Sequence, residues 1–120
     1  MFTEDNQTDF HTNLKKYMDE LVNLVYDLSL KFPKEEIYGV TSQIRRASLS
    51  IVLNYIEGYA RVKKLVLKNF LETSYGSLKE TKYLLEFCLK RKYINKDDFL
   101  NADKLTNNIG KMIWGILKKL

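Results

Sequence analysis

Helix-breaking residues are nearly absent from this chain of 120 residues, which contains one proline and five glycines. Proline and glycine mark the turns between short strands, so a sandwich or barrel of many short strands is excluded. The apolar residues make up 45% of the chain and recur at spacings of three and four, the period of an amphipathic helix. A chain of this length forms one domain around a single core. We therefore expect an all-α fold in one domain, residues 1–120.

Short turns divide the chain into four periodic segments. Pro33 separates the first two, and the acidic Glu35 and Glu36 suit the first turn of a helix. Gly58 offers a stop for the second segment, and Asn95 suits the N-cap of the fourth. Long helices joined by short connections predict an antiparallel up-and-down four-helix bundle. The predicted helices span about 9–31, 35–59, 66–91 and 96–119.

The second helix carries apolar side chains on nearly every side. Ile51 lies on one face, Val52 and Ile56 on another and Leu53 on a third, so one bundle core cannot cover them all. A second apolar surface of this kind is typical of a contact between subunits. The sequence therefore predicts a homo-oligomer. Its predicted interface comprises Leu49, Val52, Leu53, Ile56 and, from the fourth helix, Trp114.

A narrow polar stripe runs along the same helix and has two interpretations. It is either a seam whose side chains pair inside the protein and fix its register, or a contact for a ligand or nucleic acid through Arg46 and Arg61. We favour the seam, because buried polar groups are usually satisfied within the protein. The predicted seam consists of Gln43, Arg46, Asn54 and Glu57.

The net charge of +5 is unevenly distributed: residues 61–92 carry nine basic and three acidic side chains, whereas residues 1–39 carry four and eight. A basic surface along the third helix would contact phosphates without reading sequence. Tyr75 and Tyr83 flank it and would stack on unpaired bases. The alternative is a surface that uses lysine for solubility, with structural tyrosines. The candidate nucleic-acid contacts are Arg61, Lys63, Lys64, Lys68, Lys79, Lys82, Lys90 and Arg91.

The sequence contains few side chains that could act as catalytic groups or metal ligands. The single cysteine, Cys88, excludes an internal disulfide and a Cys-based zinc site, and it falls on the apolar stripe of the third helix. We expect the single histidine, His11, to be solvated. A metal held by Glu57 and Glu80 is a third hypothesis, but the Glu-x-x-His repeats of di-iron bundles are missing. We therefore expect no enzymatic activity, no cofactor, and no catalytic or metal-binding residues.

Several segments resemble a known family. The run FPKEEIYGVTSQIRRASLSI at 32–51, followed by NYIEG at 54–58, is similar to the signature of the small four-helix-bundle proteins encoded within 23S rRNA intervening sequences. GSLKE at 76–80 and IGKMI at 109–113 match the same family. Val52 stands where that family usually has proline, so we expect a straighter second helix.

The resemblance implies a homopentameric ring, on which a charge of +5 per chain becomes about +25 and favours binding of RNA or DNA. The accessory variability determinant of diversity-generating retroelements has a similar fold. That similarity implies an alternative, in which the chain binds a reverse transcriptase and its template RNA. Residues 1–10 lack a signal-peptide pattern, and no apolar run reaches the roughly 20 residues that span a bilayer. We expect a cytoplasmic protein without a membrane partner.

Overall fold

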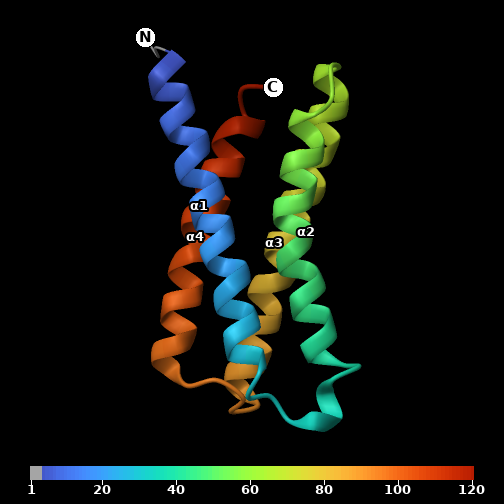
Figure 1. Cartoon of the computed structure of the whole chain (residues 1–120), viewed down its shortest axis with the longest axis vertical. Helices are drawn as coiled ribbons and strands as arrows, with labels where there is room; N and C mark the ends of the chain where they lie inside the picture. Colours follow the sequence, from blue (N-terminus) through green and yellow to red (C-terminus); the bar gives the residue numbers. More distant parts are fainter. Residues whose placement is uncertain (1–3) are drawn as a thin grey trace.

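The four predicted helices form and run antiparallel to one another (Figure 1). The computed structural model describes residues 4–120, and within that range it contains no strand. The start of the acidic N-terminal segment, residues 1–3, lies outside the described residues. A short 3-10 helix, η1 (Lys34–Glu36), precedes the second long helix. The long helices are α1 (Glu4–Ser29), α2 (Val40–Tyr59), α3 (Lys64–Lys90) and α4 (Lys96–Leu117).

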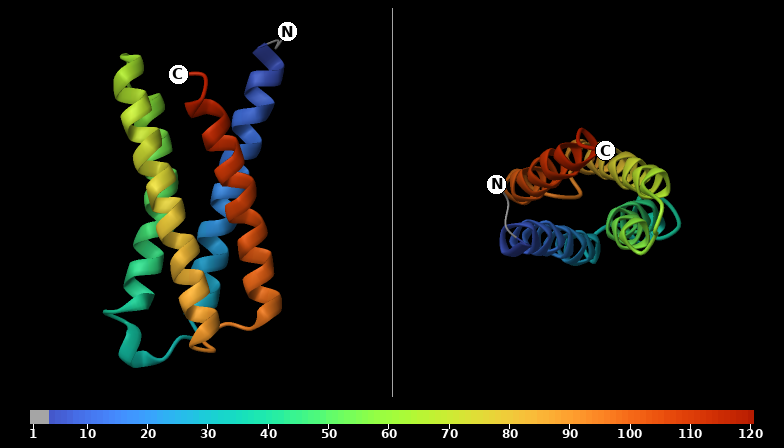
Figure 2. Two further views of the ribbon diagram at one scale, coloured as in Figure 1. Left: turned by 180° about the vertical axis from the view of Figure 1, so that it is seen from behind. Right: turned by 90° about the horizontal axis from the view of Figure 1, so that it is seen from above.

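Each helix packs against two neighbours, as the view down the bundle in Figure 2 shows. α2 lies between α1 and α3, and α4 also lies between α1 and α3, whereas the backbones of the diagonal pairs do not come close within residues 4–120. Both ends of the described chain lie at the same end of the bundle as the α2–α3 turn, and η1 lies at the opposite end (Figure 1). The outward faces of α2 and α4 therefore point to different sides of the molecule.

One core cluster receives side chains from all four helices, as the apolar spacing predicts. Full burial of one large aliphatic side chain contributes roughly 1.5–3 kcal/mol. Cys88 is fully buried in this core, and burial raises the pKa of its thiol to about 12. None of the helices within residues 4–120 combines the length and apolar content needed to cross a bilayer. The side chains exposed by less than 2% include Leu14, Met18, Leu21, Ile44, Ile51, Leu71, Leu85, Ile109 and Ile113.

The second helix begins later than predicted, at Val40 rather than about residue 35. The Glu36 carboxylate accepts a hydrogen bond from the Val40 backbone N–H at 3.4 Å and another from the Tyr93 hydroxyl at 2.8 Å. It therefore satisfies the first turn of α2 from outside the helix and ties η1 to the α3–α4 turn. A Cβ on the N-cap residue, Gly39, would lie 2.5 Å from the Glu36 Oε1 atom. A side chain at that position would displace the carboxylate from its hydrogen bonds.

Gly58 does not stop α2, contrary to the prediction, since it lies within the helix and none of the described glycines has a positive φ. Its role is close packing. A Cβ at this position would lie 3.0 Å from the Cβ of Phe70 and 3.1 Å from a methyl carbon of Leu67 on α3. The missing side chain allows α2 and α3 to approach one another at the end of the bundle that carries their turn.

Hydroxyl groups continue the close α2–α3 contact towards the other end. The Ser74 hydroxyl donates a hydrogen bond to the backbone carbonyl of Ile51 at 2.7 Å, and both residues are buried. The hydroxyls of Ser50 and Ser77 share a hydrogen bond of 2.7 Å. Small polar side chains thus give the two helices a fixed register at short range.

The end of α3 contains the only positive φ among the described non-glycine residues, 63° at Lys92. The backbone N–H of Tyr93 donates to the carbonyl of Cys88 at 2.9 Å, and that of Lys92 donates to Leu89 at 3.0 Å. These two bonds form a Schellman motif, in which the left-handed position is usually glycine. Lysine there costs conformational energy that glycine would avoid.

We predict that Lys92→Gly stabilises the protein by about 0.5–1 kcal/mol, because relief of the left-handed strain exceeds the added freedom of the unfolded chain. Urea unfolding followed by circular dichroism measures the change. The matched control is Arg91→Gly, at a φ of −78°, which should destabilise the protein. Destabilisation by Lys92→Gly would contradict this account of the turn.

Candidate functional site

The basic residues predicted to contact nucleic acid do not form one continuous patch. They lie along α3, whose 27 residues span roughly 40 Å at 1.5 Å per residue. Arg61, Lys63, Lys64 and Lys68 lie at or near the α2–α3 turn, Lys79 and Lys82 in the middle of α3, and Lys90 and Arg91 at its far end.

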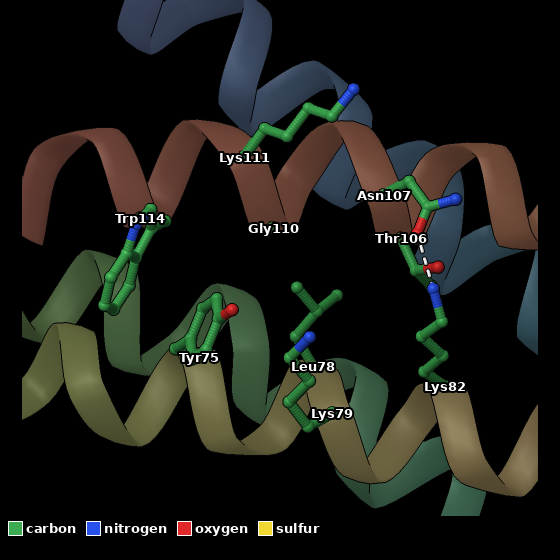
Figure 3. Close-up of a pocket in the computed structure, with 9 residues that line it drawn as sticks. All are labelled: Tyr75, Leu78, Lys79, Lys82, Thr106, Asn107, Gly110, Lys111 and Trp114. Carbon is green, nitrogen blue, oxygen red and sulfur yellow. Dashed lines mark hydrogen bonds between the residues drawn. The ribbon is translucent and has the colours of Figure 1, made fainter.

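A groove between α3 and α4 combines basic and aromatic side chains (Figure 3). Trp114 extends from α4 towards α3, and its ring centroid lies 5.8 Å from that of Tyr75 at an interplanar angle of 37°. The Lys79 Nζ atom lies 5.2 Å from the centroid of the Tyr75 ring, a cation–π distance. The α3/α4 groove has a volume of about 270 Å³ and is lined by Tyr75, Leu78, Lys79, Lys82, Thr106, Asn107, Gly110, Lys111 and Trp114.

Local spacing brings these residues together. Tyr75, Lys79 and Lys82 follow one another at intervals of four and three, so they share one flank of α3. On α4, Asn107 and Trp114 are seven residues apart and share the flank that faces them. The sequence does not show which flanks of α3 and α4 meet, so this contact could be found only from the tertiary structure.

The Lys82 side chain makes its polar contacts with other residues of the chain. Its ammonium donates a hydrogen bond to the Asn107 side-chain oxygen and lies 3.4 Å from an Asp103 carboxylate oxygen, with the Lys82 side chain 31% exposed. The Asn107 amide also donates to Asp103 at 3.4 Å. Lys82 therefore joins α3 to α4, and its charge is largely neutralised.

Arg61 is also engaged within the chain. Its guanidinium pairs with Glu57 four residues earlier and lies 5.2 Å from the centre of the Phe70 ring. Glu57 therefore pairs with Arg61 rather than with the predicted seam or with Glu80. The Glu57 carboxylate of the metal hypothesis is thus bound by Arg61. Within the described part of the chain, no three His, Cys, Asp or Glu side chains form a group that could hold a metal ion.

Lys111 belongs to the site but was not predicted from the sequence. It is exposed, lies between Asn107 and Trp114 on α4, and extends away from α3 in Figure 3. The excess of basic residues over acidic ones pointed to α3 alone. The sequence signal that was available is the four-residue spacing of Asn107 and Lys111, which puts both residues on one flank of α4. Tyr83, in contrast, is 63% exposed and does not line the groove.

The predicted subunit interface divides into separate parts. Leu53 and Ile56 are 59% and 46% exposed on α2, and Leu49 is half-buried. Val52 is 8% exposed and packs in the chain's own core, contrary to its predicted place at an interface. Trp114 lies in the α3/α4 groove, and α4 is diagonal to α2. Only Leu49, Leu53 and Ile56 therefore form an outward apolar face, which we call the α2 face.

The predicted polar seam is mostly at the surface. Gln43 and Arg46 are exposed, and together with Asn54 they line a second groove, of about 500 Å³, between α2 and α3. The Asn54 amide donates to the carbonyl and the hydroxyl oxygen of Ser50 at 2.8 Å. Leu49 and Leu53 line the same groove. Polar and apolar residues are therefore mixed on one surface. Of the predicted seam, Asn54 binds to its neighbour Ser50, and Glu57 pairs with Arg61 at the surface.

His11 is half-buried in an aromatic cluster rather than solvated as predicted. Its Nδ1 atom shares a 2.5 Å hydrogen bond with the Tyr55 hydroxyl, and its ring lies edge-on to Tyr59 at 5.0 Å. Burial lowers the pKa of His11 and raises those of Tyr55 and Tyr59, so all three are neutral at pH 7. The His11–Tyr55 hydrogen bond connects α1 to α2. Beside it, His11 and Tyr59 line a mainly apolar pocket of about 530 Å³.

A family model for the 23S rRNA-intervening sequence proteins matches residues 12–115. The chain belongs to this family. The match includes all of α2 and α3 and most of α1 and α4, and it supports the intervening-sequence family rather than the alternative retroelement accessory protein.

The fold is also that of a crystallised relative. A protein of unknown function from the S23 ribosomal protein family of Bacteroides thetaiotaomicron is similar at a TM-score of 0.79 and 21% sequence identity. The similarity covers 88% of this chain and 98% of that chain. No curated protein matches the sequence.

We predict that Lys82→Glu destabilises the protein by about 1–2 kcal/mol, because it replaces the ion pair with repulsion from Asp103. The double variant Lys82→Glu/Asp103→Lys should recover most of this stability, as measured by urea unfolding. Lys79→Glu makes the same charge change without breaking an ion pair and should cost less than about 0.5 kcal/mol. Equal destabilisation by the two single variants would show that Lys82 does not join the helices.

Proposed function

We propose that this member of the 23S rRNA-intervening sequence family is a homo-oligomeric scaffold, assembled as a pentameric ring, that binds RNA or DNA through basic surfaces. The observation that carries the proposal is the separation of two unlike surfaces. The α2 face is apolar, and the α3/α4 groove is basic and aromatic. Because α2 and α4 are diagonal in the bundle, subunits can assemble through the α2 face without covering the α3/α4 groove. We assign the protein no enzymatic activity and no cofactor.

Assembly is supported by the cost of leaving the α2 face in water. Leu53 and Ile56 expose about half of their surface, and burying such side chains gains roughly 25 cal/mol per Å². Arg46 and Gln43 at the edge of the same face supply the polar rim that subunit interfaces usually carry. A ring of five uses heterologous contacts, so the α2 face would meet a different surface of the next subunit.

Nucleic-acid binding is supported by the sign and the placement of the charge. Residues 61–92 have six more basic than acidic side chains, and Lys79 and Lys111 remain exposed beside the α3/α4 groove. Such charges bind phosphates by releasing counterions, without a preference for sequence. In a ring, the fields of the five repeated surfaces add.

We predict that Leu53→Asp converts the oligomer to single chains, because an unpaired carboxylate buried at the interface costs several kcal/mol. Light scattering gives the mass, and far-ultraviolet circular dichroism should show unchanged helicity, since Leu53 is exposed in the single chain. Leu100→Asp, at another exposed leucine on α4, is the control and should leave the mass unchanged. A wild-type protein that is monomeric at all salt concentrations would overturn the assembly proposal.

We predict that Lys79→Glu/Lys111→Glu weakens binding to RNA and DNA. It should also flatten the dependence of log K on log salt, by about 0.7 for each phosphate of a single strand that the variant no longer neutralises. Fluorescence anisotropy of labelled oligonucleotides measures both effects. The variant Lys16→Glu/Lys31→Glu changes the charge equally at exposed positions outside the groove and serves as the control. Equal weakening in both variants would show that the net charge alone determines binding.

A further inference from the structure

The α3/α4 groove contains a feature that phosphate binding does not explain. Trp114 is the chain's only tryptophan, and it is 50% exposed although its indole is among the largest apolar groups in the protein. Tyr75 covers part of it, with the two ring centroids 5.8 Å apart. The remaining surface of the indole is open to a flat partner.

We propose that Trp114 and Tyr75 form a stacking platform for an unpaired base, so that the groove selects single-stranded over duplex nucleic acid. This inference rests on the proposed nucleic-acid binding and names the form of ligand that the groove takes. Every base has an aromatic face, and its stacking on a side chain is worth roughly a factor of ten in affinity. In a duplex those faces are covered by neighbouring bases, so a duplex gains only the phosphate contacts.

A cation beside the platform is placed for the phosphate backbone. The Lys79 ammonium lies 5.2 Å from the Tyr75 ring centroid, at the edge of the platform. Lys111 lies on the α4 wall, three residues before Trp114, and its side chain extends away from α3 (Figure 3). A base on the platform therefore has one cation at its edge, the Lys79 ammonium, to bind a phosphate, while Lys111 adds positive charge on the α4 side of the groove.

The size and floor of the groove also suit one flat ring. Its volume is about 270 Å³, slightly below the roughly 300–1,000 Å³ of small-ligand sites. Gly110 contributes no side chain between the aromatic and the lysine parts, and a Cβ there would lie 3.1 Å from a methyl carbon of Leu78. Beyond it, Lys82 of α3 is hydrogen-bonded to Asn107 of α4 across the groove (Figure 3).

The test uses the intact protein and oligonucleotides of about 16 nucleotides, within the range of known single-strand sites. Single-stranded RNA, single-stranded DNA and their duplexes are titrated against tryptophan fluorescence, which reports on Trp114 alone. Both single strands should quench the emission, and the duplexes should bind without quenching. In the anisotropy assay with labelled oligonucleotides, which needs no tryptophan, Trp114→Leu should lower single-strand affinity roughly tenfold and leave duplex affinity unchanged, whereas Trp114→Phe should retain most of the affinity.

Matched variants separate the ways in which the proposal could fail. Tyr83→Leu removes an exposed ring outside the groove and should change nothing. Equal affinity for single strands and duplexes, without quenching but still weakened by Lys79→Glu/Lys111→Glu, would overturn the platform and leave nucleic-acid binding intact. Absence of any binding at low salt would overturn both proposals. A lower oligomer mass for Trp114→Leu would assign Trp114 to a subunit contact and overturn the platform.

Discussion

The close approach of α2 and α3 is the constraint on which the rest of the structure depends. Gly58 removes a side chain where Leu67 and Phe70 pack, and the Ser50–Ser77 hydrogen bond holds the helices at short range. This pairing fixes the rotation of both helices about their axes. It turns the α2 face outward, and it leaves the flank of α3 that carries the aromatic and basic side chains facing α4. Both proposed surfaces follow from one helix–helix contact.

Polar groups make this close contact possible and connect it to the remaining helices. Among the described residues, no buried side-chain nitrogen or oxygen lacks a hydrogen-bond partner. An unpaired buried hydroxyl would cost about 1–3 kcal/mol, so complete pairing lets the interface use serine where larger apolar residues would separate the helices. The hydrogen bond between His11 and Tyr55 then joins α1 to α2, and Tyr93 joins the α3–α4 turn to Glu36 at the opposite end of the bundle.

The sequence by itself determined the four helices, their antiparallel order and most of the core, including Cys88. These follow from the spacing of apolar residues within each helix, which is local information. It did not determine where α2 begins, because the cap depends on Glu36 and Tyr93, which are 57 residues apart. Nor did it place Lys111 beside Trp114 in the same groove as Lys79.

The rotation of each helix within the bundle was decided only by the tertiary structure. Val52 and Ile56 are four residues apart and were predicted on the same interface, yet Val52 is buried and Ile56 is 46% exposed. On a helix that is apolar on nearly every side, the sequence pattern favours no single orientation. The neighbouring helices make that choice, because Gly58 and Ser50 of α2 allow close packing against α3.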